Sequence, residues 1–336
     1  MLVTITGAYR NAGDHLIGDR ARSLLNAFVD SDIVNVDRRQ ITDESYELFN
    51  NARAVLLCGG PAYQKEMYPT IYPIELDRIK TKVIPFGLGW KGALDSSPHD
   101  FEFTPEASHF IREVHKRIEL SSVRDNLTLD VVQDLGIKNV SLTGCPAWYD
   151  LRHITRDYEH LAKPKRIVYS LPAKPQKNVL ATIAGISRMF PFAKKTLAFH
   201  HGWQPSESKV GLEMKAWHSK VFRFALLRGW GYADLAGGLD KFADLYTAAD
   251  LHIGYRVHAH LYSLSQQSAS ILISEDSRGQ GQIQTLGGPE LTSKTPAKEI
   301  LDAIEAHYDT RGATVAASVN TIHKSFEKMT DFLATI

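Results

Sequence analysis

Short runs of apolar, β-branched residues recur along this chain, and stretches with helical periodicity separate them. Such alternation is typical of α/β proteins, because a parallel neighbouring strand is reached only through a long crossover connection. In the first half we expect strands at residues 2–6, 32–36, 54–58, 82–89, 118–123 and 139–144, and helices at 14–29, 105–117 and 125–135. In the second half we expect strands at residues 166–171, 194–201, 229–234, 250–255 and 269–274, and helices at 207–228 and 239–249.

A polar, charged and proline-containing segment, 154–166, separates the two series and has the composition of a domain linker. With 336 residues, the chain has enough material for two domains. We therefore predict an α/β fold in which two Rossmann-like domains, 1–155 and 165–295, face a cleft. A helical tail, 296–336, could pack back on the first domain. Ligands of such folds bind at the carboxyl ends of the strands.

Composition excludes several classes of function. The formal net charge is +1, so no broad basic field favours nucleic acid, and any anion site must be local. The two cysteines, Cys58 and Cys145, are too few for a disulfide framework and favour a reduced, cytoplasmic setting. The N-terminus lacks signal-peptide features and no apolar run has the length of a membrane span, so membrane contact would be at most peripheral. Metal-ligand spacings are absent, also around His200 and His201, and we expect neither a metal nor a cofactor.

The first predicted strand runs directly into the sequence GAYRNAGDHLIGDRARSLL, residues 7–25. Its glycines permit a tight turn, and Asn11 and Asp14 are residue types that cap a helix, which we expect to begin near His15. Asp14 either points into the cleft as part of a substrate-binding loop or only caps the helix, and the spacing does not decide between the two. The dinucleotide and P-loop fingerprints are absent.

Two further strand ends carry glycine or charge. In AVLLCGGPAY, Gly59 and Gly60 would let the backbone approach a ligand closely, or they form an ordinary turn. In SSVRDNL, Arg124 could hold a carboxylate or phosphate through both of its terminal nitrogens. The alternative for this arginine is a surface pair with Asp125, which could also cap the next helix.

The remaining candidates lie in turns and loops. Cys145 sits in a turn without a neighbouring base, so we do not assign it as a nucleophile. Residues 273–288, ISEDSRGQGQIQTLGG, are interpreted as a polar, glycine-rich loop after the last strand. Arg278 could close over a bound anion there, or the loop could simply be solvated. Aromatic residues that could stack on a sugar, or pack beneath a loop, are Tyr63, Tyr68, Tyr72 and Trp90.

The stretch GYRVHAH, residues 254–260, carries the strongest local signal. If the strand ends at Gly254 and a helix starts near Arg256, the helix N-terminus and the arginine together form an anion site. A histidine beside it could transfer protons near neutral pH. At about 100° per residue, His258 and His260 point to nearly opposite sides, so only one of them faces the site. Spacing alone would place His260 beneath Arg256, and both histidines could instead be satisfied core residues.

Taken in order, these motifs resemble the polysaccharide pyruvyl transferase family. The matching pieces are NAGDHLI (11–17), LLCGG (56–60), SVRDNLT (122–128), TGCPA (143–147) and GYRVHAHLYSL (254–264). The resemblance implies a fold like that of two-domain, GT-B-like glycosyltransferases. It also implies an enzyme that uses phosphoenolpyruvate as donor and a pair of sugar hydroxyls as acceptor, and makes a pyruvate ketal on a glycan or glycolipid.

Residue by residue, the family's Arg-x-His donor motif falls on Arg256, Val257 and His258, so the resemblance favours His258 over His260. Its arginine before aspartate falls on Arg124. Its Asn-x-Gly-Asp loop falls on the residues from Asn11 to Asp14. The chain departs from the family pattern at Pro61, where a third glycine is common, at Cys145, where an aspartate is common, and at Arg278, the nearest basic residue to a frequent lysine.

We therefore expect Arg256 and the adjacent helix N-terminus to hold the phosphate of phosphoenolpyruvate, and Arg124 or Arg278 to hold its carboxylate. His258 would be the general acid, and Asp14 would orient or deprotonate the acceptor hydroxyl. The acceptor would be a sugar, a glycan or a lipid-linked saccharide, and the protein could form a homo-oligomer. The alternatives are a nucleotide-sugar glycosyltransferase of the same fold and a non-catalytic glycan-binding or assembly protein.

Overall fold

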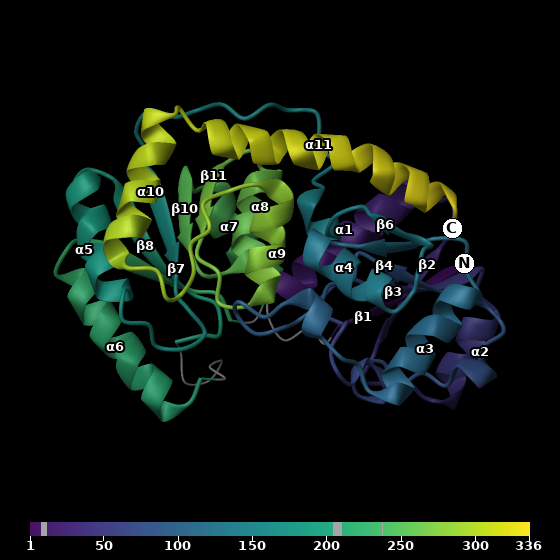
Figure 1. The fold of residues 1–336 in the computed structure, drawn as a ribbon. Helices are drawn as coiled ribbons and strands as arrows, with labels where there is room; N and C mark the ends of the chain where they lie inside the picture. Colours follow the sequence, from purple (N-terminus) through teal and green to yellow (C-terminus); the bar gives the residue numbers. More distant parts are fainter. Residues whose placement is uncertain (8–11, 204–209, 237) are drawn as a thin grey trace.

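The computed structural model describes residues 1–7, 12–203, 210–236 and 238–336, and it is built on parallel sheets throughout (Figure 1). In the first half, a four-stranded sheet has the order β2-β1-β3-β4. Its strands are β1 Leu2–Thr6, β2 Ile33–Asp37, β3 Ala54–Cys58 and β4 Lys82–Phe86. A two-stranded sheet, β5 Ser121–Val123 with β6 Val140–Leu142, adjoins β4 through a parallel bridge between Leu88 and Val123.

The second half is built on a five-stranded sheet of order β11-β10-β7-β8-β9. Its strands are β7 Arg166–Ser170, β8 Lys194–Phe199, β9 Trp230–Asp234, β10 Leu251–Gly254 and β11 Ala269–Leu272. Residues 156–165, within the predicted linker, join the two halves without helix or strand. The strands follow the apolar runs of the sequence, and they end two or three residues earlier than predicted at β4, β8 and β11.

Helices fill the connections between strands. In the first half these are α1 Ala12–Phe28, α2 Asp43–Asn50, α3 Pro105–Lys116 and α4 Asn126–Asp134. In the second half they are α5 Val179–Met189, α6 Leu212–Leu226, α7 Leu239–Thr247, α8 Val257–Ser265 and α9 Ser277–Leu286. The C-terminal part contains α10 Ala297–Asp309 and α11 Ala313–Ala334. Among the described residues, no helix combines the length and the apolar character needed to cross a membrane.

The prediction of a loop over residues 273–288 is wrong, because α9 lies within this segment. Asp276 caps the helix by accepting a hydrogen bond from the backbone N–H of Arg278. The glycines that suggested a loop are there for close packing. A Cβ on Gly279 would lie 2.6 Å from Oγ of Ser274, and one on Gly281 would lie 2.7 Å from Cγ of Asp125. Tertiary contact, which a local pattern does not report, therefore explains both glycines.

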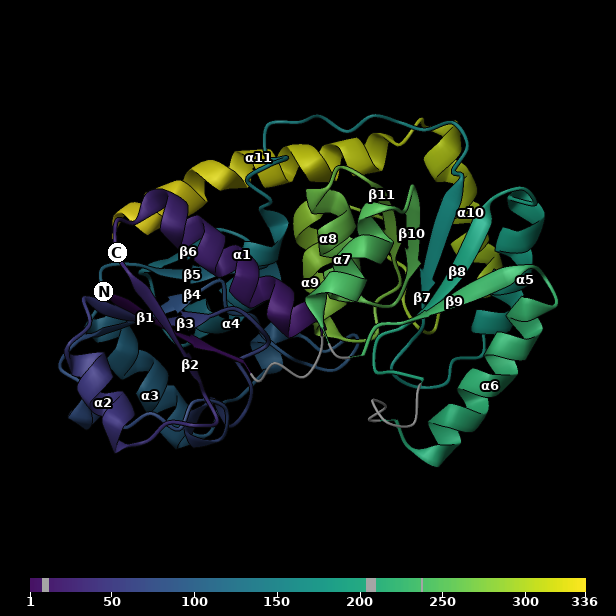
Figure 2. The ribbon, with the colours of Figure 1, turned by 180° about the vertical axis from the view of Figure 1, so that it is seen from behind.

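The C-terminal helix α11 runs along one side of the molecule and reaches across both halves (Figures 1 and 2). Its Phe326 packs against Phe28 of α1 and against Tyr149, with ring centroids 5.7 and 5.4 Å apart. Near the C-terminus, Phe332 packs on Phe86 of β4 at 5.5 Å. The helix thus joins the second half of the chain to the core of the first.

The two halves also pack directly against each other through α1 and α4 on one side and α7, α8 and α9 on the other. Buried polar side chains cross this interface. The Trp148 indole N–H donates to Oε1 of Gln282 over 2.7 Å, and the backbone N–H of Asn126 donates to Oγ1 of Thr285 over 2.9 Å. Because this interface holds the start of α1 against the start of α8, the carboxyl ends of the two large sheets contribute to one region.

Candidate active site

The junction between β10 and α8 has the geometry expected from the sequence. The strand ends at Gly254, Arg256 is the N-cap residue, and α8 begins at Val257, which is half-buried. Gly254 has a φ of 139°, and a Cβ there would lie 2.3 Å from the backbone oxygen of Ser170, so only glycine fits this turn. The Arg256 guanidinium donates through Nε to the Leu171 backbone oxygen over 2.9 Å. A positive side chain therefore stands at a helix N-terminus, where backbone N–H groups favour an anion.

His258 lies in the first turn of α8 and is half-buried against the start of α1. A Cβ added to Gly13 would lie only 2.2 Å from its Nδ1. Burial lowers the pKa of His258 to about 3, and the positive charges of Arg278, Arg124 and Arg256 contribute to the lowering. The imidazole is therefore neutral without ligand, and three arginines from three separate segments are close enough to act on it.

Asp14 belongs to the first turn of α1, which begins at Ala12 and not near His15. It is half-buried, and its charge is among those that raise the pKa of Arg278. The carboxylate thus lies close enough to Arg278 to act on it from the opposite side of the interface. Asn11, the other candidate of this loop, lies outside the described residues.

Arg278 stands at the start of α9 and is held by Asp276, the residue that caps the helix. Its Nε and one terminal nitrogen donate to the Asp276 carboxylate, the latter over 2.6 Å. Burial lowers the pKa of Arg278, but the hydrogen bond to Asp276 and the charges of Asp276, Glu275 and Asp14 outweigh this effect and raise it. The side chain is 36% exposed, whereas that of Arg124 is 4% exposed.

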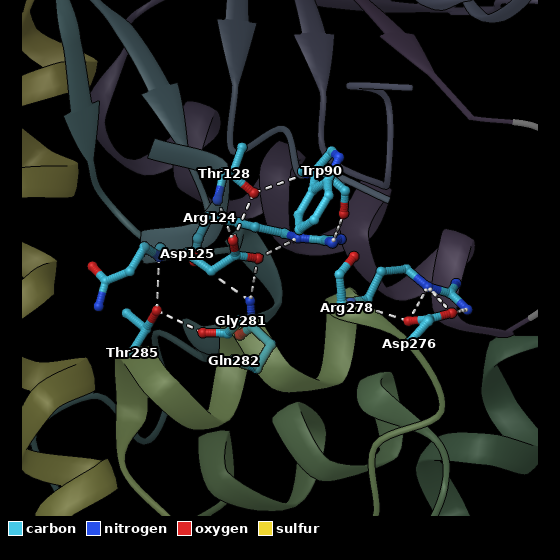
Figure 3. Close-up of polar contacts among 12 residues, drawn as sticks. Trp90, Arg124, Asp125, Thr128, Asp276, Arg278, Gly281, Gln282 and Thr285 are labelled. Carbon is cyan, nitrogen blue, oxygen red and sulfur yellow. Dashed lines mark hydrogen bonds and ion pairs between the residues drawn. The ribbon is translucent and has the colours of Figure 1, made fainter. Parts of the chain in front are cut away.

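Arg124 follows β5 and is almost completely buried (Figure 3). Its Nε donates to Oδ2 of Asp125 over 2.9 Å, and a terminal nitrogen donates to the Trp90 backbone oxygen over 3.0 Å. The alternative of a surface Arg–Asp pair is therefore wrong, because both side chains are at most 4% exposed. Asp125 caps α4, as expected, by accepting the Thr128 backbone N–H over 2.8 Å. A Cβ on Gly89 would overlap the Arg124 guanidinium, so that glycine makes room for it.

No motif of the sequence indicated a function for Gln282. It is fully buried on α9, and its Nε2 donates to Oδ2 of Asp125 over 3.3 Å (Figure 3). Its Oε1 accepts from the Trp148 indole N–H. The Asp125 carboxylate is thereby tied to both halves of the chain, and with it the orientation of Arg124. An isolated glutamine within a glycine-rich segment carries no recognisable motif, so only the tertiary structure reveals this function of Gln282.

His260, in contrast to His258, is part of the core. It is 3% exposed, and its Nδ1 contacts Oγ of Ser270 over 2.8 Å. The same oxygen contacts Nδ1 of His252, whose Nε2 contacts Oγ of Ser170, each over 2.8 Å. These contacts hold His260 away from the three arginines, although its spacing alone would have placed it beneath Arg256.

Gly59 and Gly60 follow β3 with φ angles of 58° and 78°, which favour glycine. A Cβ on Gly59 would lie 2.1 Å from Cγ2 of Ile17, so this glycine lets α1 pack closely on the strand end. The Gly60 backbone oxygen accepts the Gly89 N–H over 2.9 Å. Cβ added at Gly60 would meet no atom within 4 Å, so among the described residues the space beside it is open.

Cys145 and most of the aromatic candidates are packed in the core. Burial raises the pKa of Cys145 to about 11, so its thiol is protonated at neutral pH and is a poor nucleophile. Tyr63, Tyr72 and Trp90 are at most 1% exposed, which excludes stacking on a sugar in this conformation. Tyr68 is half-buried and stacks on Phe110 with centroids 5.0 Å apart. In the described part of the chain, no cluster of histidine, cysteine and acidic side chains is arranged to hold a metal ion.

The fold is similar to that of several solved structures. Staphylococcus aureus MnaA in complex with UDP aligns with a TM-score of 0.58 at 10% identity, covering 100% of this chain and 97% of that one. UDP-GlcNAc 2-epimerase from Neisseria meningitidis, bound to UDP-GlcNAc, aligns with a TM-score of 0.55 at 11% identity, covering 100% of both chains. HepE of Anabaena in complex with UDP and glucose aligns with a TM-score of 0.55 at 10% identity, covering 100% of this chain and 99% of that one. At such low identity the likeness concerns the fold alone, and it confirms the predicted class, an α/β fold of GT-B-like type with two Rossmann-like halves.

The sequence identifies the family. The model of the family described as polysaccharide pyruvyl transferase matches residues 11–277, well over half of the chain. Comparison with curated protein sequences returns no match. The chain belongs to the polysaccharide pyruvyl transferase family, as the resemblance of its motifs predicted, and its matched region contains Asp14, Arg124, Arg256 and His258.

Proposed function

We propose that this protein transfers the pyruvyl group of phosphoenolpyruvate to two hydroxyls of a sugar, forming a pyruvate ketal and releasing phosphate. The observation that carries the proposal is the convergence of Arg124, Arg256 and Arg278 on His258, with Asp14 nearby. Phosphoenolpyruvate carries a phosphate and a carboxylate on a three-carbon unit, so it needs several positive groups within a short distance. Membership of the pyruvyl transferase family supports the same donor.

In this proposal Arg256 and the N-terminus of α8 bind the phosphate, because a helix N-terminus beside an arginine is the best anion site of the region. Arg278 is the better candidate for the carboxylate, since a third of its side chain is exposed. Arg124 is nearly inaccessible and bonded to Asp125 and Trp90, so its proposed contribution is mainly its charge. The positive charges of these arginines attract the negatively charged donor and neutralise part of its charge.

The reaction balances without a cofactor. A proton is delivered to the methylene carbon of the donor, which makes C2 electrophilic, and the first sugar hydroxyl adds there and loses its proton. The bond from C2 to the phosphate oxygen then breaks, and the second hydroxyl adds and loses its proton in turn. Of these two hydroxyl protons, one replaces the proton that became part of the methyl group and the other leaves with the phosphate.

The proposed general acid is His258, and the proposed base that orients or deprotonates the acceptor hydroxyl is Asp14. A general acid must carry a proton, whereas burial and the arginines keep His258 neutral when no donor is bound. The phosphate and carboxylate would neutralise much of the arginine charge and raise the pKa of His258 in the complex. Donor binding would thus both position the substrate and prepare the acid.

The proposed acceptor is a sugar, a glycan or a lipid-linked saccharide at the side of the site formed by the first half of the chain. In this proposal the acceptor would lie beside Gly60 and the start of α1. We propose a cytoplasmic location for the reaction, since phosphoenolpyruvate is a metabolite of that compartment. We also propose that the protein can form a homo-oligomer.

A direct test compares ligands by thermal shift, because a ligand that binds only the folded protein raises its melting temperature. We expect phosphoenolpyruvate to stabilise the protein and a panel of UDP-sugars to have little effect. Stabilisation by UDP-sugars alone would favour the competing function, nucleotide-sugar transfer. We consider that function because the fold is similar to that of proteins solved with UDP. Turnover is then tested by measuring phosphate release with a panel of acceptors. If the protein binds phosphoenolpyruvate but releases no phosphate with any acceptor, a non-catalytic binding protein is favoured.

A further inference from the structure

A cavity of about 200 Å³ opens beside Arg256, and no residue of α1 is among the described residues that line it. It lies at the carboxyl ends of β7 and β8 and at the start of α6. The residues lining it that bear on its chemistry are Arg256, His200, His201, His218, Phe199 and Met214. Ligand pockets for drug-sized molecules occupy about 300–1,000 Å³, so this cavity is suited to one small group.

His218 supplies the observation that distinguishes this cavity from an ordinary packing gap. It lies on α6, is only 5% exposed and lines the cavity, yet its Nδ1 has no hydrogen-bond partner within the described part of the chain. The ring packs between two aromatic side chains, with its centroid 4.9 Å from that of Phe199 and a parallel stack on Trp203 at 6.5 Å. A buried polar atom without a partner is costly, so a ligand in the cavity that bonds to this nitrogen would remove that cost.

His200, at the end of β8, adds a second fixed imidazole. Its Nε2 lies 2.7 Å from the Tyr246 hydroxyl, which sets the orientation of the ring at the cavity wall. Burial lowers the pKa of His200 well below its ordinary range, and the charge of Arg256 adds to this lowering. The pKa of His218 is lowered to about 4 for the same two reasons. Both rings are therefore neutral at pH 7.

The charge of the lining selects an anion. Among the described residues that line the cavity, Arg256 carries a permanent charge and none is acidic. The Glu275 carboxylate lies at the border of the cavity, where it accepts the backbone N–H of Ala173, a lining residue, over 2.9 Å. Glu275 offsets part of the arginine charge, and burial raises its own pKa. An arginine with neutral imidazole donors and a helix N-terminus is a combination suited to a tetrahedral oxyanion.

We propose that this cavity is an oxyanion subsite that holds the phosphate group of the donor and, after transfer, the inorganic phosphate, with His218 and His200 as residues that determine specificity for it. The inference rests on the proposed function and deepens it, since Arg256 lies at the boundary between the cavity and the region of His258. When the bond between C2 and the phosphate oxygen breaks, the leaving group is already bound on the side opposite the acceptor. Its departure would not require passage through the acceptor site.

The experiment titrates inorganic phosphate into the protein by calorimetry at pH 7.5, without donor or acceptor. The variant His218→Phe keeps an aromatic ring between Phe199 and Trp203 but removes the unpartnered nitrogen. The matched control is His307→Phe, because His307 is equally buried, 6% exposed, and lies on α10 away from this cavity. His218→Gln, which retains a polar group, is the second variant if the phenylalanine does not fold.

We expect one phosphate per chain, at least about tenfold weaker binding in His218→Phe, and unchanged binding in the control, since a hydrogen bond to a charged group contributes about that factor. Pyruvate, which lacks a phosphate, should not compete. Equal phosphate affinity of wild type and His218→Phe would overturn the proposal, and so would UDP binding more tightly than phosphate and losing affinity in the same variant.

The failure of this inference and that of the proposed function are distinguishable. If phosphoenolpyruvate is bound and turned over but phosphate affinity does not respond to His218, the subsite is wrong and the function stands. If phosphate binding requires His218 but phosphoenolpyruvate neither competes with it nor reacts, the subsite stands and the donor is wrong. With both correct, His218→Phe raises KM for phosphoenolpyruvate more than it lowers kcat, because the lost contact is already made in the bound donor.

Discussion

The substitution Gly13→Ala tests whether the position of His258 is what the site depends on. The new Cβ would lie 2.2 Å from Nδ1, 2.6 Å from Cγ and 2.9 Å from Cε1 of His258, whereas ordinary contact begins at 3.4 Å. Either the imidazole or the start of α1 must therefore move by about 1.2 Å. A displacement of about 1 Å at a catalytic group can cost about 100-fold in rate. We expect turnover with phosphoenolpyruvate to fall by about that factor.

Stability should respond much less than activity. Alanine in place of glycine within a helix gains about 1 kcal/mol, and overpacking costs about 1–3 kcal/mol, so the two effects largely cancel. The assays are phosphate release with an acceptor that supports wild-type turnover, phosphoenolpyruvate affinity by calorimetry, and chemical denaturation. Gly231→Ala is the matched control, because a Cβ there meets only the Lys195 backbone oxygen at 3.9 Å. Wild-type turnover in Gly13→Ala protein would refute the assignment of His258 to the reacting centre.

Three further predictions concern charge and buried polar groups. Gln282→Leu leaves Asp125 and the Trp148 N–H each without a partner across the interface, and we expect a loss of about 2–4 kcal/mol in urea denaturation; a loss below about 0.5 kcal/mol would contradict this. Burial raises the pKa of Asp150, but hydrogen bonds from Arg152, Arg20 and Gln266 outweigh this and hold it below its ordinary value, so its stabilising contribution is present above the unfolded pKa of about 3.9 and is lost as the pH falls below it. Asp150→Asn should therefore be less stable than wild type at pH 7, and in thermal scans the difference should begin to narrow only below about pH 4 and narrow further as the pH falls, whereas a constant difference down to about pH 2 would exclude the linkage. Finally, the pKa of His258 is about 3 without ligand and should rise when phosphoenolpyruvate binds, so calorimetry at pH 8 in buffers of different ionisation enthalpy should show proton uptake that His258→Gln abolishes; equal uptake in that variant would assign the proton elsewhere.

Local patterns in the sequence were sufficient for the elements that carry the site. The β10–α8 junction, with Gly254 at the end of the strand and Arg256 at the N-cap, was predictable because an apolar run, a glycine and a helical periodicity follow one another within a few residues. The capping of α4 by Asp125 was predictable for the same reason. The order of the five motifs was enough to identify the family, because each motif lies at the end of a strand of the same α/β fold.

Local patterns failed where a residue serves a distant contact. The glycines of residues 273–288 looked like loop glycines, yet Gly279 and Gly281 allow α9 to pack against Ser274 and Asp125. The pairing of Arg124 with Asp125 was foreseen only as a surface pair, because burial by α9 cannot be inferred from either residue. His218 and its cavity had no signal at all, since the cavity exists only between the ends of strands and the start of α6.

The sequence by itself determined the strands and most of the helices, although not α9, and it determined which strand ends carry charged side chains and to which family the chain belongs. These properties depend on residues that are neighbours in the chain. The family pattern already favoured His258 over His260, but only the tertiary structure shows that three arginines from separate segments surround His258 and that Gly13 contacts it across an interval of more than two hundred residues. The physical reason is that the site lies where the two halves pack together, and its charge and burial are produced by that packing.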